Sequence, residues 1–198
     1  MNIEVMEKGP QFDMMSAFIA SQAPNICKGK VRHTYIREQS ISGANMMVVA
    51  YTAKKGTRSL RDSFNIHGFA FIKKTKSVMY IDVICGIGVG KRILHTIYNK
   101  ARALNIKCIT LSALPHVINF YRKEGFIHAE SCKSETEIIR VIAEANKSLR
   151  FKDMTQAMSD KAFRKLLSVL VKYKLTSNKS CKNISSCSID GYVMSKKL

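Results

Sequence analysis

The chain has 198 residues, of which 46% are hydrophobic and 24% charged, enough for one globular domain with a sizeable core. No apolar stretch approaches the roughly 18 residues of a membrane span, and the acids Glu4 and Glu7 exclude a secretory signal at the N-terminus. The 33 basic and 14 acidic residues give a net charge of +19, which favours an anionic partner or reflects a bias towards lysine. We expect an intracellular protein, in the cytoplasm or the nucleus.

The first 85 residues predict a helix followed by three strands. Apolar residues recur at helical spacing over 11–28, and a basic stretch with a short second helix follows. Three segments rich in β-branched, aromatic or other apolar residues predict strands at 44–53, 66–74 and 77–85. The polar and basic segment 54–65 between the first two predicts a long hairpin loop.

The next forty residues alternate between helix and strand. A 3.6-residue period predicts a helix over 88–104, and the apolar run 106–114 predicts a strand buried on both faces. Pro115 suits the first turn of another helix, and Gly125 suits its C-cap. Residues 126–131 predict a further strand.

The last third of the chain is charged and helix-periodic before it becomes polar. Two helices are predicted from 133 to about 175, then a polar loop to 188 and a last strand over 189–198. The fold class is therefore α/β (an α+β mixed sheet), with about six to seven strands flanked by helices. We expect a single domain over 1–198, in which 133–188 form a helical insertion plus polar loop before the last strand.

The six cysteines form no C-x-x-C pair. In an intracellular chain of this length we expect them to be reduced, with several buried as small apolar side chains. Cys132, Cys181 and Cys187 lack the usual spacing of zinc ligands, so we expect no metal site.

Three glycines, Gly86, Gly88 and Gly90, stand between a predicted strand and a predicted helix. The first-turn N–H groups of a helix have no internal acceptor, and glycines let the backbone approach an anion closely. Lys91 and Arg92 add positive charge in that first turn, where it opposes the helix dipole unless an anion is bound. The pattern indicates either an anion-binding loop or a tight turn without a ligand.

Two common phosphate motifs do not match this segment. A P-loop requires Ser or Thr where Arg92 stands, and the Rossmann pattern requires G-x-G-x-x-G rather than the G-x-G-x-G found here. The later segment "INFYRKEGF" (118–126) supplies a second motif at a fixed position after the glycines. Together, "GIGVGKRIL" and "INFYRKEGF" resemble the GNAT superfamily of N-acetyltransferases. The resemblance covers about 66–128 and resumes at "YVMSKKL" (192–198).

The resemblance implies a GNAT-like acyl-CoA N-acyltransferase fold and acetyl-CoA as the co-substrate, with no metal. The strand before the loop would present backbone to the thioester, from Val83, Ile84 and Cys85. The loop and first helical turn would hold the pyrophosphate through backbone N–H groups and nearby charge, at Ile87, Gly88, Val89, Gly90, Lys91 and Arg92. The chain departs from the family pattern at Cys85, where Arg or Gln is usual, and at Leu114, where Asn is frequent.

The resemblance also implies catalytic roles. Tyr121 matches the tyrosine that protonates the departing CoA thiolate, and a phenol with one proton suits that task. Asp82, on the strand beside the expected cleft, is the first candidate for the general base that deprotonates the acceptor ammonium. His67 on the neighbouring strand is the second candidate, and Ser112 could orient a water.

The implied function is transfer of the acetyl group from acetyl-CoA to an amine, on a small molecule or on a protein lysine or N-terminus. In this family the acceptor binds near the first helices, the loop that corresponds to 54–65 and the last strands. These segments are basic here, which fits an acceptor that carries phosphate or carboxylate. The alternative is a catalytically weak or inactive GNAT-like module that binds nucleic acid or an acidic protein through its basic surface. The sequence leaves the oligomeric state open.

Overall fold

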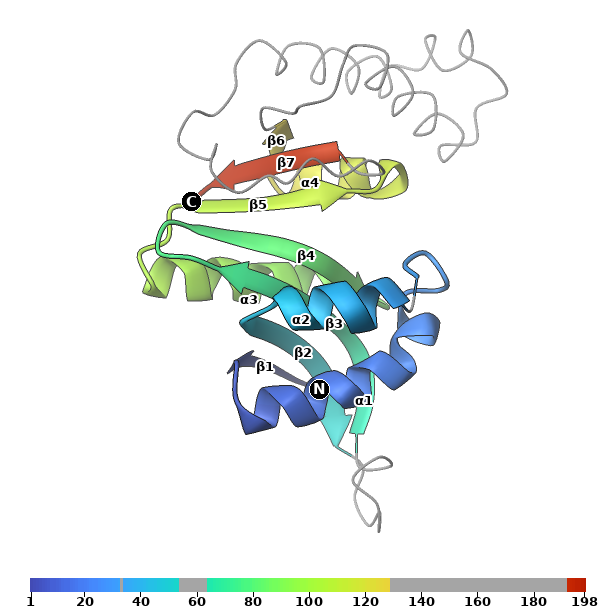
Figure 1. Cartoon of the computed structure of the whole chain (residues 1–198). Coiled ribbons are helices and arrows are strands. Elements are labelled where there is room, and N and C mark those ends of the chain that lie inside the picture. Colours follow the sequence, from blue (N-terminus) through green and yellow to red (C-terminus); the bar gives the residue numbers. More distant parts are fainter. Residues whose placement is uncertain (33, 54–63, 129–191) are drawn as a thin grey trace, which may run out of the picture. The chain divides into compact units, whose positions relative to one another are not determined.

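The computed structural model describes residues 1–32, 34–53, 64–128 and 192–198, which divide into two compact units (Figure 1). The first unit is Met1–Lys107 and the second is Cys108–Leu198. The elements of the first unit, in chain order, are β1 (Asn2–Glu7), α1 (Pro10–Ile26), the π-helix η1 (Tyr35–Ser40), α2 (Ile41–Gly43), β2 (Met46–Ala53), β3 (Phe64–Lys74), β4 (Val78–Gly86) and α3 (Gly90–Ala103).

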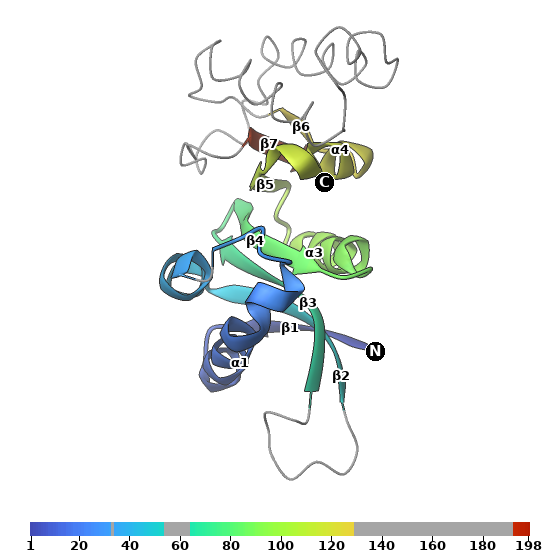
Figure 2. The same ribbon diagram turned by 90° about the vertical axis from the view of Figure 1, so that its right-hand side faces the viewer.

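The four strands of the first unit form an antiparallel sheet in the order β1-β2-β3-β4. Helices α1 and α3 cover opposite faces of this sheet (Figure 2). On the α1 side, the fully buried Phe12 and Ile19 belong to one apolar cluster with Phe69 and Phe71 of β3. Helix α3 forms because its apolar residues recur at 3.6-residue spacing, and the whole apolar stripe is buried: Ile93, Leu94, Ile97, Tyr98 and Ala101.

The observed elements confirm the predicted helices and strands of this unit, with end points that differ by a few residues. One element, β1, was not predicted. Its apolar residues Ile3 and Val5 alternate with polar ones over only six residues, and its burial alternates in the same way. Such a short edge strand forms through its pairing with β2, from Asn2 opposite Tyr51 to Glu7 opposite Met46.

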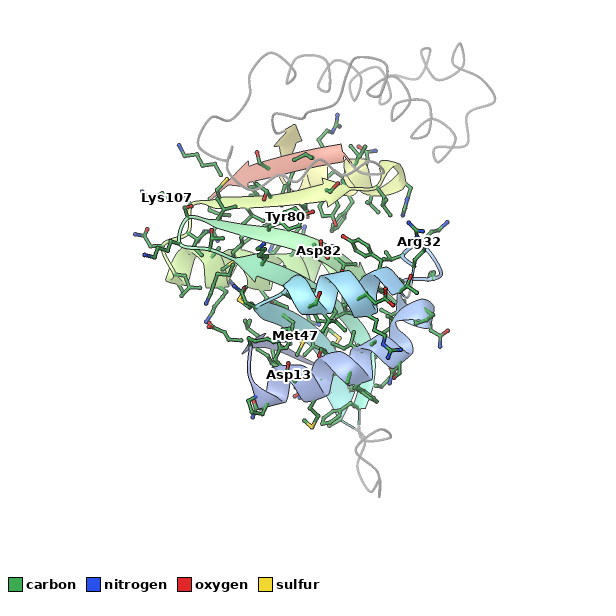
Figure 3. All side chains as sticks on the ribbon, viewed as in Figure 1. Asp13, Arg32, Met47, Tyr80, Asp82 and Lys107 are labelled. Carbon is green, nitrogen blue, oxygen red and sulfur yellow. A yellow bond between two sulfur atoms is a disulfide. The ribbon has the colours of Figure 1, made fainter. Side chains whose placement is uncertain are left out.

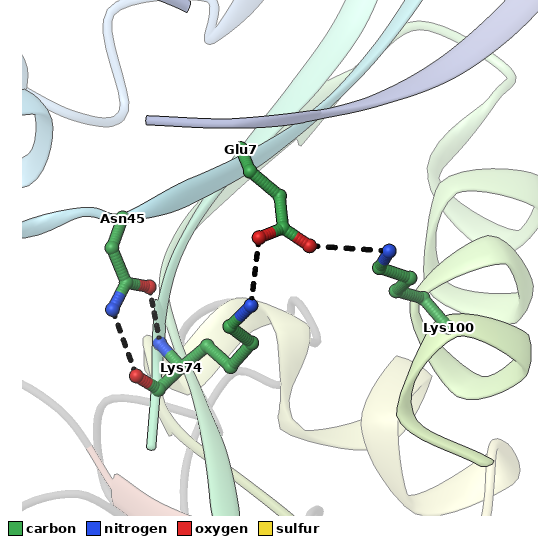
Figure 4. Close-up of polar contacts among 4 residues, drawn as sticks. All are labelled: Glu7, Asn45, Lys74 and Lys100. Atoms are coloured by element: carbon green, nitrogen blue, oxygen red, sulfur yellow. Dashed lines mark hydrogen bonds and ion pairs between the residues drawn. The ribbon is translucent and has the colours of Figure 1, made fainter. Parts of the chain in front are cut away.

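Glu7 joins the end of β1 to two other elements (Figure 4). Its carboxylate oxygens lie 2.9 Å from the Lys74 Nζ of β3 and 3.2 Å from the Lys100 Nζ of α3. The hydrogen bond from Lys74 and that from Lys100 lower the pKa of Glu7. Asn45 supports the same corner, because its side chain exchanges two hydrogen bonds with the Lys74 backbone. The edge strand is thereby tied to the sheet and to the helix behind it.

The second unit contains β5 (Cys108–Ala113), the 3₁₀ turn η2 (Pro115–Val117), α4 (Ile118–Lys123), β6 (Ile127–His128) and β7 (Tyr192–Lys197). Strand β7 pairs antiparallel with both β5 and β6, so the last strand of the chain is central in the order β5-β7-β6. As predicted, the helical segment starts at Pro115. Helix α4 ends at Lys123 with Glu124 as its C-cap, and the predicted C-cap Gly125 lies one residue further, with the left-handed φ of 84° that glycine adopts after a helix.

Several predicted features lie outside the described residues. They are most of the loop 54–65, the greater part of the strand 126–131, and the insertion 133–188 with its two helices and polar loop. The single domain over 1–198 stays a prediction. In the described part of the chain, no helix combines the length and the apolar character that a membrane crossing requires.

The expectation of reduced cysteines is wrong. Cys27, the C-cap residue of α1, forms a disulfide with Cys85 near the end of β4, with their Cα atoms 5.1 Å apart. Cys108 is also disulfide-bonded. The burial of these cysteines was predicted correctly, since Cys27, Cys85 and Cys108 are 6%, 8% and 4% exposed. The bond from Cys27 to Cys85 spans 58 positions of sequence, so no local motif indicates it.

This disulfide gives a first testable prediction. The chain-entropy model assigns about 4 kcal/mol to a cross-link that closes a loop of this length. Cys27→Ala and Cys85→Ala should each lower the free energy of unfolding by about 3 kcal/mol, measured by urea denaturation. Because both variants lose the same bond, the double variant should lose far less than the sum of the two. Fully additive losses would contradict the cross-link, and Met14→Ala, at an exposed position, is the control.

Candidate functional site

The turn from β4 to α3 is held against the sheet by the side chain of Val89. A Cβ atom added to Gly86 would lie 2.8 Å from Val89 Cγ2, and one added to Gly68 would lie 2.7 Å from the same atom. The turn is also anchored by a hydrogen bond of 2.9 Å from the Ile87 N–H to the His67 carbonyl. Glycines at 68 and 86 are therefore required so that the turn can pack closely on the sheet.

Gly88 has a different role in this turn. Its φ is 72°, in the left-handed region that glycine adopts without a penalty, and no atom lies within 4 Å of where a Cβ would be. The backbone at Gly88 thus borders open space. Next to it Ile87 exposes 55% of its surface. The apex of the turn is available to a ligand, whereas Gly86 at its base is packed.

The N-terminus of α3 has the features of an anion-binding helix end. No side chain caps it, no acid occurs in its first turn, and the first helical hydrogen bond is that from the Ile93 N–H to the Val89 carbonyl. The preceding N–H groups have no acceptor within the helix. Lys91 and Arg92 are exposed in this turn, where their charges add to the positive end of the helix dipole.

Asp82, the candidate base, is the extra residue of a β-bulge in β4. Phe71 pairs with Val83 and Ile72 pairs with Ile81, so Asp82 has no partner on β3. Bulges re-aim side chains and occur next to active sites. Asp82 lies on β4 close to the helical segment before β2 (Figure 3), and its carboxylate accepts hydrogen bonds from Tyr35, at 2.9 Å, and from Ser40.

His67, the second candidate base, is the extra residue of another bulge. Ala50 pairs with Gly68 and Tyr51 pairs with Ile66, which leaves His67 unpaired on β3. Its Nε2 lies 2.9 Å from Thr52 Oγ1. Tyr51 belongs to the cluster under α1, so by strand alternation its neighbour Thr52 faces the opposite side. The structure therefore separates His67 from Asp82 across the sheet.

The residues expected to hold acetyl-CoA are continuous along β4 and the start of α3. Val83, Ile84 and Cys85 pair through one edge of β4 with β3 residues. Val83 and Cys85 are buried beneath α1, so only their backbone could serve a ligand, and the Cys85 sulfur is committed to the disulfide. The glycine turn follows directly. One short stretch of the first unit thus contains the whole predicted loop.

Tyr121 lies on α4 in the second unit and is 6% exposed. Its ring contacts Phe120 and Phe126, with centroids 5.1 and 5.6 Å away. Burial raises the pKa of Tyr121 above its usual value, so the phenol keeps its proton at neutral pH. In the same unit, the buried Oγ of Ser112 on β5 has no hydrogen-bond partner among the described residues.

The site contains residues that sequence reasoning missed. Tyr35, Ser40 and Cys27 contact β4, although the basic stretch around the first two predicted only a loop and a short helix. The polarity of Tyr35 and Ser40 was visible in the sequence. What was not visible is the bulge that brings Asp82 to them, because a bulge is defined by pairing with another strand.

Comparison with solved structures identifies the fold. A crystal structure of Tetrahymena GCN5 matches with a TM-score of 0.53 and 9% sequence identity, covering 100% of this chain and 96% of that one. The chain thus has the fold of the GNAT N-acetyltransferases, a mixed sheet flanked by helices, and this prediction is confirmed. No protein-family model matches the sequence.

Two curated proteins are similar to a short segment of this chain in sequence. Both are described as "Uncharacterized N-acetyltransferase ycf52", one from Porphyra purpurea at 50% identity and one from Pyropia yezoensis at 45%, each over 42 residues. The matched segment is 21% of this chain, and it spans 24% of the length of each relative. The resemblance to the N-acetyltransferases is therefore distant and partial in sequence, whereas the match in fold extends over the whole chain.

The packing of the turn gives a second prediction. Gly86→Ala should lower the free energy of unfolding by about 1–3 kcal/mol, because its Cβ meets Val89. Adding Val89→Ala should recover about 1 kcal/mol relative to the sum of the single effects. Gly68→Ala is the matched comparison: its Cβ also meets the Cys85 carbonyl at 2.8 Å and Gly86 Cα at 2.9 Å, so Val89→Ala should not rescue it. Equal rescue of both would refute this account of the turn.

Proposed function

We propose that the protein is an acetyl-CoA-dependent N-acetyltransferase. One observation carries the proposal: a chain with the GNAT fold has, between β4 and α3, an open glycine turn that leads into an uncapped basic helix end. Backbone N–H groups there suit a pyrophosphate, which is the most highly charged part of CoA. The acceptor is an amine whose identity stays open.

The cofactor would lie along the turn. The N–H groups from Gly88 to Arg92 would hold the pyrophosphate, since the Ile87 N–H already donates to the His67 carbonyl. Lys91 and Arg92 would offset the charge of the pyrophosphate. The backbone of Val83, Ile84 and Cys85 would align the thioester. Backbone binding explains how the chain could work with Cys85 where Arg or Gln is usual, since no particular side chain is needed at that position.

The reaction would be a direct transfer. Asp82, directly or through a water, takes a proton from the acceptor ammonium, and the freed amine nitrogen attacks the thioester carbonyl carbon. The resulting tetrahedral species expels the CoA sulfur as the C–S bond breaks. Tyr121 gives its proton to that thiolate, and its protonated state at neutral pH suits this role. The products are an amide and free CoA thiol.

Binding of acetyl-CoA is the first test of this function. Ligand at a hundred times its dissociation constant stabilises a protein by about 2.7 kcal/mol, so the melting temperature should rise by several degrees. Gly88→Glu should abolish this rise, because a carboxylate would occupy the open space at the turn.

Gly29→Glu is the matched control for that variant. Gly29 also has a left-handed φ, 67°, and open space around its Cβ position, so the backbone strain is the same while the site is different. The acetyl-CoA shift should survive in Gly29→Glu. No shift in the wild type would remove the proposed function, and salt-dependent binding of nucleic acid in its place would support the alternative of a binding module.

Tyr121→Phe tests the acid. Removal of a general acid costs about a hundredfold or more in turnover, followed as free CoA thiol released with a panel of primary amines. The acetyl-CoA melting shift should be retained, because the phenol is not part of the turn. Tyr98→Phe, at a buried tyrosine of α3, makes the same chemical change elsewhere and should leave turnover near wild type. Unchanged turnover in Tyr121→Phe would remove its assigned role.

A further inference from the structure

The segment between α1 and β2 supplies two hydroxyl groups to a single carboxylate. Tyr35 Oη donates to Asp82 Oδ1 at 2.9 Å, and Ser40 Oγ donates to Asp82 Oδ2. Each oxygen of Asp82 is thus held by a different donor. Neither donor is charged, and about two of the four lone-pair positions of the carboxylate stay available to another group.

The conformation of this segment explains how both donors reach one carboxylate. Tyr35 and Ser40 are the first and last residues of the π-helix η1, five positions apart. In an α-helix, residues five apart point about 140° away from each other. A π-helix closes its hydrogen bonds from i to i+5, as from the Ile41 N–H to the Ile36 carbonyl, and brings such residues to one side. π-helical turns are rare in proteins, and those that occur are frequently found at functional sites.

The bulge in β4 provides the other half of the contact. Val83 and Cys85 face the cluster beneath α1, to which Ile36 of η1 also belongs. Regular alternation would turn Asp82 away from that face. Because Asp82 is the extra residue of the bulge, it lies on the same side as Val83 and reaches η1. Two irregularities, one in a helix and one in a strand, meet at this carboxylate.

Both hydroxyl groups keep their protons near neutral pH. Burial, and then the nearby charge of Asp82, raise the pKa of Tyr35, so the phenol does not ionise near neutral pH. Ser40 is 1% exposed, which protects its hydrogen bond from competition by water. A group held in this way has a fixed direction, and a fixed direction is what a general base requires.

We propose that Tyr35 and Ser40 are positioning residues that aim the Asp82 carboxylate at the acceptor amine. This inference rests on the proposed function, in which Asp82 is the base. It makes the segment after α1 part of the machinery for proton removal.

The experiment compares Tyr35→Phe and Ser40→Ala with the wild type by three measurements. The first is the acetyl-CoA melting shift, which should be unchanged because neither residue contacts the glycine turn. The second is turnover with primary amines: kcat should fall about tenfold in each variant, with KM for acetyl-CoA unchanged. The third is the ¹³C signal of the Asp82 carboxyl carbon in protein labelled at aspartate, assigned by its loss in Asp82→Asn. This signal should move in both variants.

Ser42→Ala is the matched control. Ser42 lies two residues beyond Ser40, is exposed, and donates to the Glu38 carbonyl instead of to Asp82. It should leave both kcat and the Asp82 signal as in the wild type. If Tyr35→Phe and Ser40→Ala leave either quantity unchanged, or if Ser42→Ala loses as much, the positioning role is overturned while the proposed function stands. If the wild type releases no CoA thiol with any amine, the result contradicts the proposed function itself and not only the positioning role.

Discussion

The single extra residue in β4 is the constraint on which the arrangement of the first unit depends. Below the bulge, Ile81 pairs with Ile72, and above it Val83 pairs with Phe71 on the side of α1. The strand can therefore supply apolar side chains to both layers and still present Asp82 to the η1 segment. In a regular strand, a carboxylate at this position would point into the other apolar layer, where its burial would cost several kcal/mol.

The two glycines of the turn, Gly86 and Gly88, look equivalent in sequence but have different structural roles. Gly86 is a packing glycine, because Val89 occupies the place of its side chain. Gly88 is a conformational glycine, because its backbone is left-handed and its surroundings are open. The turn is held by the apolar contact of Val89 and by the hydrogen bond from the Ile87 N–H to the His67 carbonyl, and no side chain caps the start of α3. A turn held in this way, followed by an uncapped helix end, is preorganised for an anion.

The sequence predicts well whatever is contiguous in the chain. In the described part of the chain, the predicted helices, the inner strands and the glycine turn before α3 depend on local period and local glycines, and they form where expected. The contacts of Tyr35 and Ser40 with Asp82 and the disulfide depend instead on segments 42 to 58 positions apart, and the bulges depend on how neighbouring strands pair. A one-residue change of register alters the face of a whole strand, and no local pattern reports it.

The disulfide has a topological consequence. Cys27 and Cys85 close residues 27–85 into a covalent ring that includes η1, α2, β2, β3 and most of β4. A single break of the backbone inside this ring leaves one connected molecule, whereas a break before Cys27 or after Cys85 can separate a piece. Asp82, Tyr35 and Ser40 all lie inside the ring, and the glycine turn begins one residue beyond it. Asp82 and its two hydrogen-bond donors are thus linked covalently as a set, and the groups that would hold the cofactor are joined to that set covalently only through the chain that leaves Cys85.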